Sequence, residues 1–419
     1  MIYNESVYND KWETKKLSDL GDFARGKSKH RPRNDPRLFE GGGYPLVQTG
    51  EIKDANLYIM SHTQEYGEFG LKQSKLWDKN TLCITIAANI AETALLSYPM
   101  CFPDSVVGFR AYEGISTERF MYYVFSFIRN SIQNSVIGST QDNINIDFLT
   151  SLDFKIPTKK EQDKIADILS AIDLKILSNN QINDNLQHQL KLLYDYWFTQ
   201  FDFPNENGKP YRASGGAMVW CDELQREIPK GWKVSTLSDI AVLQAKSVMP
   251  QEGTAYNHYS IPAFDDTHSP EVEDGKAIAS NKYVVPDNSV LVSKLNPQFK
   301  RIWLIIDSTD NAICSTEFLP VKATETGVYA LYSLLNSDAF SVHLIQNASS
   351  STGSRKRIDP DNCMSYKFPY DQKVFARFDK AIQPLLMKIT GIPTETQALV
   401  ALRDWLLPML MNGQATISD

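Results

Sequence analysis

The sequence is poor in cysteine and histidine and has no long apolar run. Its five cysteines are scattered, odd in number and never form a C-x-x-C pair, which argues against a disulfide framework and a thiolate zinc site. Its six histidines show no H-E-x-x-H or other ligand spacing. The longest apolar stretches, Leu82–Ala88 and Ile302–Ile306, have the length of strands, far below the roughly 18 residues of a membrane span. The N-terminus is polar, without the pattern of a signal peptide. We therefore expect a cytoplasmic protein with no membrane segment and no bound metal.

The sequence also lacks a basic surplus. Its net charge is −7, with 43 basic and 50 acidic residues over 419 residues. Proteins that bind nucleic acid mainly by charge usually carry an excess of lysine and arginine. Nucleic-acid binding would therefore need local basic patches or the help of a partner. The length predicts two or three domains.

Catalytic motifs are missing as well. There is no phosphate-binding loop, nucleophile elbow or pair of catalytic carboxylates. The turn Asn296-Pro297-Gln298-Phe299 is similar to the N-P-P-[FY] signature of adenine methyltransferases, but it lacks the second proline and no glycine-rich cofactor turn precedes it. Asp274-Gly275-Lys276 could be the D-x-K of a nuclease, yet no convincing aspartate precedes it on a strand. We assign no catalytic residue, and a DNA enzyme that uses the Asn296 turn remains an alternative.

What the sequence does have is an internal repeat. The phrase Trp12-Glu-Thr-Lys-Lys-Leu17-Ser18-Asp19-Leu20 returns 220 residues later as Trp232-Lys-Val-Ser-Thr-Leu237-Ser238-Asp239-Ile240. Looser echoes follow in the same order, such as Asn80–Thr85 with Asn288–Ser293. The chain therefore reads as a tandem duplication of a unit of about 200 residues.

Each repeat begins with a mixed α/β head. Short apolar runs separated by Gly, Asn, Asp and Pro predict strands at Leu82–Ile86, Val106–Ala111, Val290–Val292 and Ile302–Ile306. The last 40 or so residues of each repeat change to helical periodicity. We thus expect an α+β fold with two globular heads.

The first long helix is predicted to start at the capping box Thr158-Lys-Lys-Glu161. Residues suited to a helix–helix seam then recur in steps of four and three, which is a heptad pattern. They are Ile165, Leu169, Ile172, Ile176, Asn179, Asn183, Leu186, Leu190, Leu193 and Trp197. The simpler alternative is an amphipathic helix packed on its own domain, but a helix of about 40 residues spans about 60 Å, more than one small domain can cover.

The second long helix has a less regular pattern. Its seam is predicted to break at Gly391 and Pro393, to restart at a capping box at Thr394–Gln397 and to bend at Pro384. After the break, the seam continues with Leu399, Leu402 and Leu406. The two seams most simply pair with each other as an antiparallel coiled coil.

This pattern divides the chain into five segments. The connector between the repeats is rich in Pro, Gly and Asn, which predicts an extended segment. The predicted segments are a first head at 1–157, a first helix at 158–200, the connector at 201–231, a second head at 232–370 and a second helix at 371–419.

Basic and amide-rich loops occur in both heads. Arginine and lysine neutralise phosphates, while Arg, Asn and Gln can read base edges. In an acidic protein such clusters indicate DNA contacts, although any one of them could be a solvated loop. The candidates are Arg25, Lys27, Lys29, Arg31, Arg33 and Arg37, opposed only by Asp35, together with Thr140, Gln141, Asn143, Lys294, Asn296, Lys300, Arg301, Arg355, Lys356 and Arg357.

Several phrases together resemble one known family. They are Pro157–Ile176, the tail Leu402–Gly413, the connector phrases Trp197–Pro204 and Ile228–Trp232, and the turn Ser293–Pro297. Across the whole chain and in this order, they are similar to the specificity subunits of type I restriction–modification systems. The helix phrases carry most of the resemblance.

The resemblance implies a DNA-recognition role without catalysis. Each head would be a target recognition domain that reads one half of a bipartite sequence in double-stranded DNA. The helix pair would set the spacer and dock two methyltransferase subunits, which bind S-adenosylmethionine and methylate adenine. Restriction subunits, if present, would add ATP- and Mg-dependent translocation and cleavage. The alternative is an autonomous bivalent DNA-binding or architectural protein.

Overall fold

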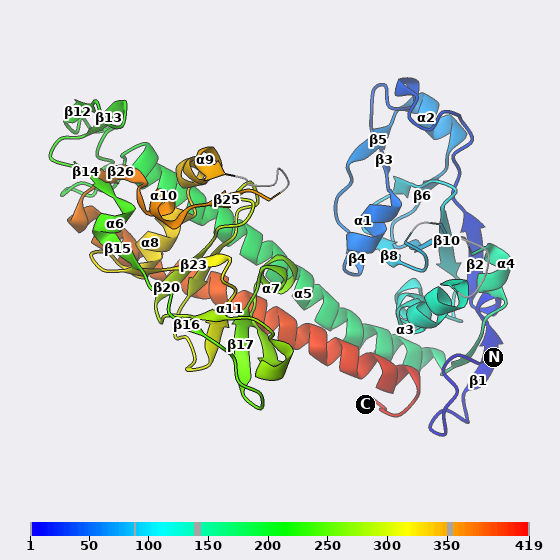
Figure 1. The fold of residues 1–419 in the computed structure, drawn as a ribbon. Helices are drawn as coiled ribbons and strands as arrows, with labels where there is room; N and C mark the ends of the chain where they lie inside the picture. The colour runs from blue at the N-terminus through cyan, green and yellow to red at the C-terminus, as the bar shows by residue number, and fades with distance from the viewer. Residues whose placement is uncertain (1, 88, 138–143, 350–354, 418–419) are drawn as a thin grey trace. The chain divides into compact units, whose positions relative to one another are not determined.

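A computed structural model describes residues 2–87, 89–137, 144–349 and 355–417. The chain divides into two compact units, one made of residues 1–178 and 398–419 and the other of residues 179–397 (Figure 1). Each unit contains one α+β head and one half of each of two long helices, α5 (Lys159–Tyr194) and α11 (Gln372–Met411). The expected architecture of two heads joined by long helices is confirmed.

The first unit is built around two sheets, ordered β2-β10-β7-β8-β4 and β5-β3-β9-β6, and a separate pair, β1-β11. Helix α3 packs on β7, β8 and β10. The elements of this head are β1 (Glu13–Lys16), η1 (Leu17–Asp19), β2 (Gly21–Arg25), η2 (Pro36–Leu38), β3 (Tyr44–Leu46), α1 (Thr49–Asp54), β4 (Tyr58–Ile59), β5 (Gln64–Tyr66), α2 (Glu68–Gln73), β6 (Leu76–Trp77), β7 (Leu82–Thr85), β8 (Thr93–Leu96), β9 (Met100–Cys101), β10 (Val106–Ala111), α3 (Glu118–Ile137), α4 (Ile146–Thr150) and β11 (Asp153–Ile156).

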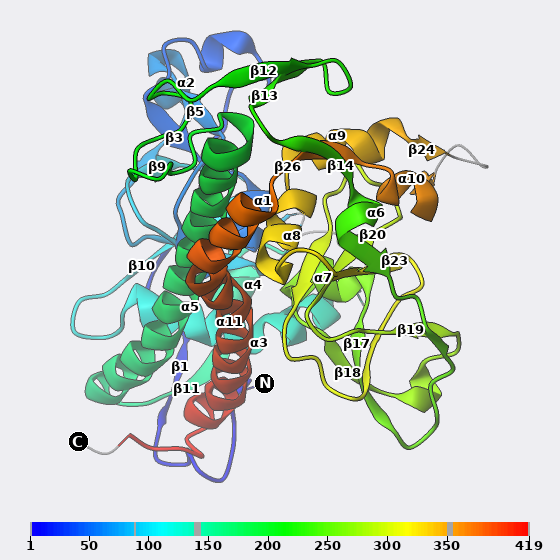
Figure 2. The same cartoon turned by 90° about the vertical axis from the view of Figure 1, so that its left-hand side faces the viewer.

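The second unit has sheets ordered β15-β23-β20-β21 and β16-β19-β22-β17-β18, and the pair β14-β26 (Figure 2). Helix α8 packs on β20, β21 and β23. The elements of this head are β14 (Lys233–Thr236), α6 (Leu237–Ile240), β15 (Ala241–Leu243), β16 (Ser247–Val248), β17 (Ala255–Tyr259), α7 (Ile261–Thr267), β18 (Glu271–Asp274), η4 (Gly275–Ala277), β19 (Lys282–Val284), β20 (Ser289–Ser293), β21 (Ile302–Ile305), β22 (Ala312–Cys314), β23 (Phe318–Ala323), α8 (Val328–Leu335), α9 (Asp338–Gln346), β24 (Ala348–Ser349), β25 (Arg357–Ile358), α10 (Pro360–Met364) and β26 (Lys367–Tyr370).

The two heads share one topology. Strands β2, β10, β7 and β8 of the first correspond in order to β15, β23, β20 and β21 of the second. Each second sheet contains one parallel pair, β3 with β9 and β17 with β22, flanked by antiparallel strands. The repeat predicted from the sequence is therefore a repeat of the fold.

The repeated phrase has a structural explanation. Leu17 and Leu237 are fully buried, and the next apolar residue of each phrase is buried too. The Asp19 carboxylate accepts a hydrogen bond of 3.0 Å from the Lys16 backbone N–H, and Asp239 accepts one of 2.7 Å from Thr236. The phrase thus caps a short helix and places two apolar side chains in the core at the start of each head.

The predicted capping box at the start of α5 is confirmed. The Glu161 carboxylate accepts from the Thr158 N–H at 3.1 Å, and the Thr158 hydroxyl accepts from the Glu161 N–H at 3.4 Å. Asp371 caps α11 in the same way, by accepting from the Val374 N–H at 2.9 Å.

The helices pair antiparallel within each unit. In the first unit Ile165 and Leu169 share an apolar cluster with Leu410, and in the second Leu190 shares one with Phe378. The predicted seam residues Ile165, Leu169, Ile176, Asn179, Leu190 and Trp197 are buried, and Ile172, Asn183, Leu186, Leu399 and Leu406 are half-buried.

The seam prediction is wrong at Leu193, which is 40% exposed. Tyr194 packs inward instead, with its ring 6.2 Å from that of Phe378. The chain turns directly afterwards into a π-helical segment, η3 (Asp195–Thr199), which buries both Trp197 and Phe198. The buried face therefore continues from Leu190 by a step of four residues to Tyr194, where the heptad count took a step of three.

The expected break in the second helix is also wrong, because α11 continues through Gly391 and Pro393. A proline removes one helical hydrogen bond, a loss that packing can offset, and Ile389 is buried on one side of it. Leu402 is another wrong seam residue, since it is 44% exposed. The inward position belongs to Arg403.

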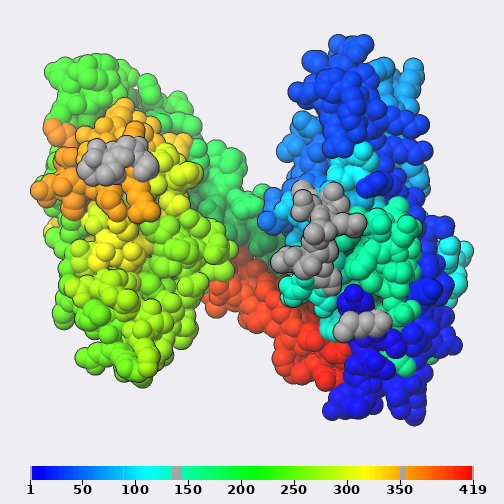
Figure 3. Space-filling view, turned by 45° about the vertical axis from the view of Figure 1, so that its right-hand side comes forward, coloured from blue at the N-terminus to red at the C-terminus, as the bar shows by residue number. Residues whose placement is uncertain are grey.

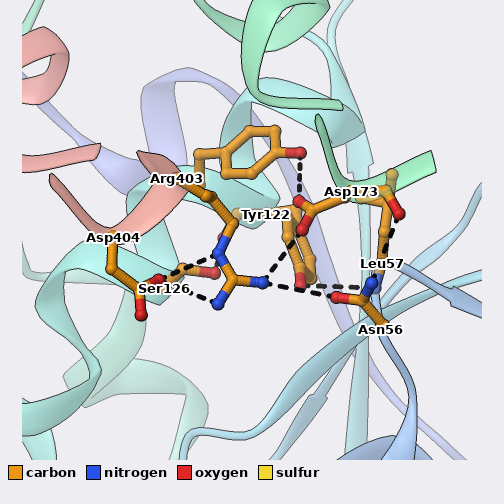
Figure 4. A network of polar contacts seen from close by, with 8 residues as sticks. Asn56, Leu57, Tyr122, Ser126, Asp173, Arg403 and Asp404 are labelled. Carbon is orange, nitrogen blue, oxygen red and sulfur yellow. Dashed lines mark hydrogen bonds and ion pairs between the residues drawn. The ribbon is translucent and has the colours of Figure 1, made fainter. Parts of the chain in front are cut away.

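A buried polar network joins the first head to both helices (Figure 4). The fully buried Asp173 carboxylate of α5 accepts from Arg403 of α11 at 2.9 Å and from the Tyr123 hydroxyl at 2.6 Å. The Asn56 amide donates to the Asp173 carbonyl at 3.3 Å. Burial, followed by the negative charge of Asp173, raises the pKa of Tyr123 well above its usual value, so its hydroxyl remains a donor.

Two further features differ from or add to the predicted segments. The connector is only partly extended, because it folds into a hairpin of β12 (Met218–Cys221) and β13 (Arg226–Pro229) and buries Phe201 and Phe203. At the other end of the chain, the Asn4 amide donates to the Met411 carbonyl at 2.7 Å, and the Ser6 hydroxyl donates to the Asn412 carbonyl at 2.6 Å. The N-terminal residues and the end of α11 thus lie together (Figure 3).

Candidate nucleic-acid interface

In the first head, the predicted basic segment runs from the end of β2 to η2. Arg25, Lys27 and Lys29 are exposed and alternate with buried Gly26 and Ser28. The Gly26 N–H donates to the Val106 carbonyl at 2.8 Å, which holds this backbone on the sheet. Alternation along an extended chain places the three cations on one outward face. No carboxylate among the described residues forms an ion pair with them.

The remaining cations of this segment are paired. Asp104 pairs with Arg33 at 2.6 Å and with Arg31 at 3.3 Å, so the expectation that only Asp35 opposes this cluster is wrong. Arg37 pairs with Asp35 at 2.7 Å, and that hydrogen bond, with a second from His30, lowers the pKa of Asp35. The arginine side chains of these pairs are more than half exposed, so a phosphate could compete for them.

In the second head, the structure brings two distant clusters together. The Asn296 N–H donates to the Lys356 carbonyl at 2.8 Å, and the Lys356 N–H donates to the Asn296 side-chain oxygen at 3.1 Å. Asn296 has a positive φ of 49°, a conformation that asparagine tolerates better than most residues. The turn after β20 and the 355–357 segment therefore form a single surface.

The tip of this surface is a four-residue turn. The Phe299 N–H donates to the Asn296 carbonyl at 2.9 Å, with Pro297 at the second position, where proline favours a β-turn. Gln298 is exposed and Phe299 is 57% exposed, with the Arg301 guanidinium 5.3 Å from its ring centre. Gln298 and Phe299 were not among the predicted contact residues, although the Asn-Pro turn could have indicated them.

Two of the predicted arginines brace this surface. Arg301 forms a two-pronged pair with Asp265 at 2.6 and 2.7 Å, and Arg357 pairs with Glu317 at 2.7 Å. The hydrogen bond from Arg357 lowers the pKa of Glu317, and the hydrogen bond from Arg301 lowers that of Asp265.

Lys300 is also partly engaged, since its ammonium donates to the Asn336 carbonyl at 2.7 Å. For Lys294, Arg355 and Lys356, no ion pair occurs within the described ranges. These three cations are therefore the ones available to phosphates.

Thr140, Gln141 and Asn143 lie outside the described residues. Their flank nevertheless matches that of the second head. The Ile144 N–H donates to the Ile86 carbonyl at 3.1 Å, just as the Ile358 N–H donates to the Lys294 carbonyl at 3.1 Å. Ile144 and Ile358 thus occupy corresponding positions in the two heads.

Two other kinds of feature are absent from the described ranges. No group of three or more His, Cys, Asp or Glu side chains there is arranged to hold a metal ion. None of the helices in the same ranges is long and apolar enough to cross a membrane.

Comparison with known proteins shows which proteins this chain is similar to. Residues 9–188 match the type I restriction modification DNA specificity domain. The type I restriction enzyme MjaIX specificity subunit of Methanocaldococcus jannaschii is 24% identical over 428 residues, covering 97% of this chain and 94% of that protein. Over residues 9–188, and along nearly the whole length of the M. jannaschii protein, the chain is similar to type I specificity subunits.

Two further specificity subunits resemble it. The HindI specificity subunit of Haemophilus influenzae is 24% identical over 346 residues, or 66% of this chain and 72% of that protein. The crystal structure of the type I restriction–modification S subunit from M. genitalium matches over 100% of both chains, with a TM-score of 0.62 and 16% identity. This structural likeness supports the fold.

Proposed function

We propose that each head reads one half of a bipartite DNA sequence and that the helix pair connects the two readers. The observation that carries this proposal is the combination of one repeated topology with two different basic surfaces. The first head offers the outward row Arg25, Lys27 and Lys29, and the second offers the Asn296 turn beside Lys356. Two heads with the same topology but different contact residues are suited to a bipartite DNA sequence whose two half-sites differ.

The long helices carry a candidate docking surface for methyltransferase subunits. Leu174 and Leu192 of α5 are 46% and 54% exposed and lie 18 residues apart, which is five helical turns and hence one face. Met387 and Trp405 of α11 have the same spacing and are 56% and 57% exposed. Each unit thus contains one such residue from each helix, which suits two copies of one partner.

In this proposal the chain selects the site and its partners supply the chemistry. S-adenosylmethionine would bind to the methyltransferase subunits, and ATP and Mg to restriction subunits where these are present. The specificity subunit would contribute contacts to double-stranded DNA and the distance between the two half-sites. Base flipping would be done by the methyltransferase, since an adenine inside a duplex is out of reach.

The test is to map methylated adenine in cells that express the chain together with its neighbouring methyltransferase gene, with each gene alone as control. We expect a split motif that occurs only when both are present. No methylation with both proteins soluble and well expressed would contradict the proposal. DNA binding by the chain alone would then favour an autonomous bivalent binder, and methylation by the chain alone a catalytic role.

Two variants separate reading from docking. Leu192→Glu with Trp405→Glu should abolish methylation while the isolated chain keeps its affinity for DNA. Lys27→Ala with Lys29→Ala should weaken DNA binding while the chain still copurifies with the methyltransferase. Equal losses of both properties in either variant would contradict the assignment of two separate surfaces.

A further inference from the structure

The two long helices are nearly interchangeable along their packed faces. Their capping residues, Thr158 and Asp371, set an offset of 213 residues between corresponding positions. With this offset, buried residues of α5 coincide with buried apolar residues of α11. The matched pairs are Ile165 with Phe378, Leu169 with Ile382, Ile176 with Ile389, Trp197 with Leu410 and Phe198 with Met411.

Two of the positions at which this likeness fails carry opposite charges. Asp173 of α5 corresponds to Leu386 of α11, and Arg403 of α11 corresponds to Leu190 of α5. In the first unit, Asp173 and Arg403 form the ion pair of 2.9 Å. In the second unit, Leu190 and Leu386 are both buried in the apolar cluster. The same place in the helix pair is therefore ionic in one unit and apolar in the other.

This asymmetry matters because the repeat creates a competing arrangement. A helix that resembles its partner can also pair antiparallel with a second copy of itself. If α5 paired with α5 of another molecule, Asp173 of each copy would face Leu190 of the other. If α11 paired with α11, Arg403 would face Leu386. In the first arrangement the fully buried Asp173 loses its cationic partner, and in the second the half-buried Arg403 loses its buried carboxylate and keeps only the exposed Asp404. Loss of the partner of a buried charge is strongly destabilising.

The native pair, in contrast, is well satisfied. Asp173 is fully buried and accepts from both Arg403 and the Tyr123 hydroxyl, and Arg403 also bonds to Asp404 at 2.8 Å. A buried ion pair of this kind adds little net stability compared with apolar residues, but it can decide which helices associate.

We propose that the Asp173–Arg403 pair makes α5 associate with α11 and excludes pairing with a second copy of the chain through like helices. The proposal does not depend on DNA recognition. Its consequence is that two different heads remain together on one helix pair, because the self-paired dimers, with two identical heads on each helix pair, are disfavoured.

The experiment uses the full chain in two differently tagged forms expressed in one cell. The quantity measured is the fraction of purified chain in mixed-tag dimers, from tandem affinity capture and light scattering. Wild type gives the background fraction of mixed-tag dimers. This background includes swapped dimers, in which α5 of one copy pairs with α11 of the other and the ion pair is kept. We expect Asp173→Leu with Arg403→Leu to raise this fraction at least severalfold, because no buried charge then opposes self-pairing.

Two controls isolate the charge pair. Asp173→Arg with Arg403→Asp keeps an ion pair with reversed sign and should stay at the wild-type fraction. Tyr123→Phe removes one hydrogen bond of the network but leaves both charges, so it should also stay there. A rise in Tyr123→Phe equal to that of the double leucine variant would show that general loosening is responsible, and would overturn the proposal.

A milder variant covers the case in which the double leucine chain does not fold. Asp173→Asn with Arg403→Gln keeps hydrogen bonds in the network and removes both charges, so we expect a dimer fraction above that of wild type. If either neutral variant is folded, as judged by circular dichroism and a cooperative melt, and remains at the wild-type fraction, the proposal is wrong.

Discussion

At the scale of single residues, the basic surface of the second head contains two kinds of side chain. Gln298 projects from a braced turn and can bond to a base edge, whereas Lys356 offers only charge. Both belong to the second head, so they form a matched pair for separating sequence reading from attraction to phosphate.

Gln298→Ala is expected to reduce the preference for the specific half-site by about 1–3 kcal/mol and to leave non-specific binding nearly unchanged. Lys356→Ala should weaken both kinds of binding alike and reduce the salt slope by about 1. Titrations of specific and scrambled duplexes at several salt concentrations measure both effects. If Gln298→Ala behaved like Lys356→Ala, the turn would not read bases.

In the first head, Arg25, Lys27 and Lys29 give a further prediction. Replacing all three with alanine removes up to three phosphate contacts, so the slope of log affinity against log salt should fall by up to about 2.7. Replacing Arg31 and Arg33, which already share Asp104, should have a smaller effect. A larger effect from the second pair would show that the outward row does not face DNA.

His268 gives a prediction on pH. Burial lowers its pKa from the ordinary value of 6.5, only partly opposed by Asp265. The folded state therefore prefers the neutral ring. The stabilisation that results from the neutral ring is complete above about pH 6.5, where His268 of the unfolded chain is neutral too. It is lost as pH falls through the lowered pKa that His268 has in the folded chain.

The test compares wild type with His268→Asn, because asparagine tolerates the positive φ of 53° at this position. The melting temperature of wild type should drop more than that of the variant between about pH 7 and pH 5.5. Equal drops would show that His268 does not titrate differently in the folded state.

At the scale of elements, sequence patterns correctly predicted features that depend on neighbouring residues in the chain. The capping box at Thr158 and the strand Val106–Ala111 were predicted correctly, since each depends on residues close together in the chain. The pairing of the two clusters through Asn296 and Lys356 was not predicted, because it joins residues 60 positions apart. The acidic partners Asp104, Asp265 and Glu317 were missed for the same reason.

The helix seam shows where counting fails. Heptad steps identified most buried positions of α5 but chose Leu193, three residues after Leu190, instead of Tyr194, which is four residues after it. In α11 they followed the leucines of the pattern, and so chose Leu402 over Arg403. Asp173 could have been found, because it lies four residues after Leu169 and three before Ile176, on the buried face.

Gly391 allows a test of the continuous second helix. It is helical, and no atom lies within 4 Å of the position that a β-carbon would take. Gly391→Ala should therefore raise the free energy of unfolding by about 0.8–1 kcal/mol, measured by denaturant titration. Gly108→Ala is the contrasting control, since its β-carbon would lie 2.8 Å from the Trp77 ring and should destabilise the fold. A loss of stability in Gly391→Ala would indicate that the helix is interrupted there after all.

At the scale of the whole molecule, the first and last strands of each head pair with each other. Strand β1 pairs with β11, and β14 pairs with β26, so each head enters and leaves its helix pair through adjacent strands. A head could therefore be exchanged without moving either helix.

Exchange of residues 12–155 for the corresponding head of a type I specificity subunit should change one half-site of the methylated motif and leave the other half unchanged. Mapping methylated adenine in cells that carry the hybrid and the methyltransferase measures the outcome. Changes in both half-sites would show that the heads do not read independently.

The bonds that join Asn4 and Ser6 to the end of α11 have a topological consequence. Because Asn4 and Ser6 are bonded to Met411 and Asn412, residues 4–412 approximate a closed loop, and the order of the two repeats along the chain has little effect on the fold. A break in the exposed turn at 206–208, with residues 2 and 417 joined by a short linker, would leave the described contacts outside the cut turn unchanged. A gene for this architecture could begin with either head and encode the same molecule.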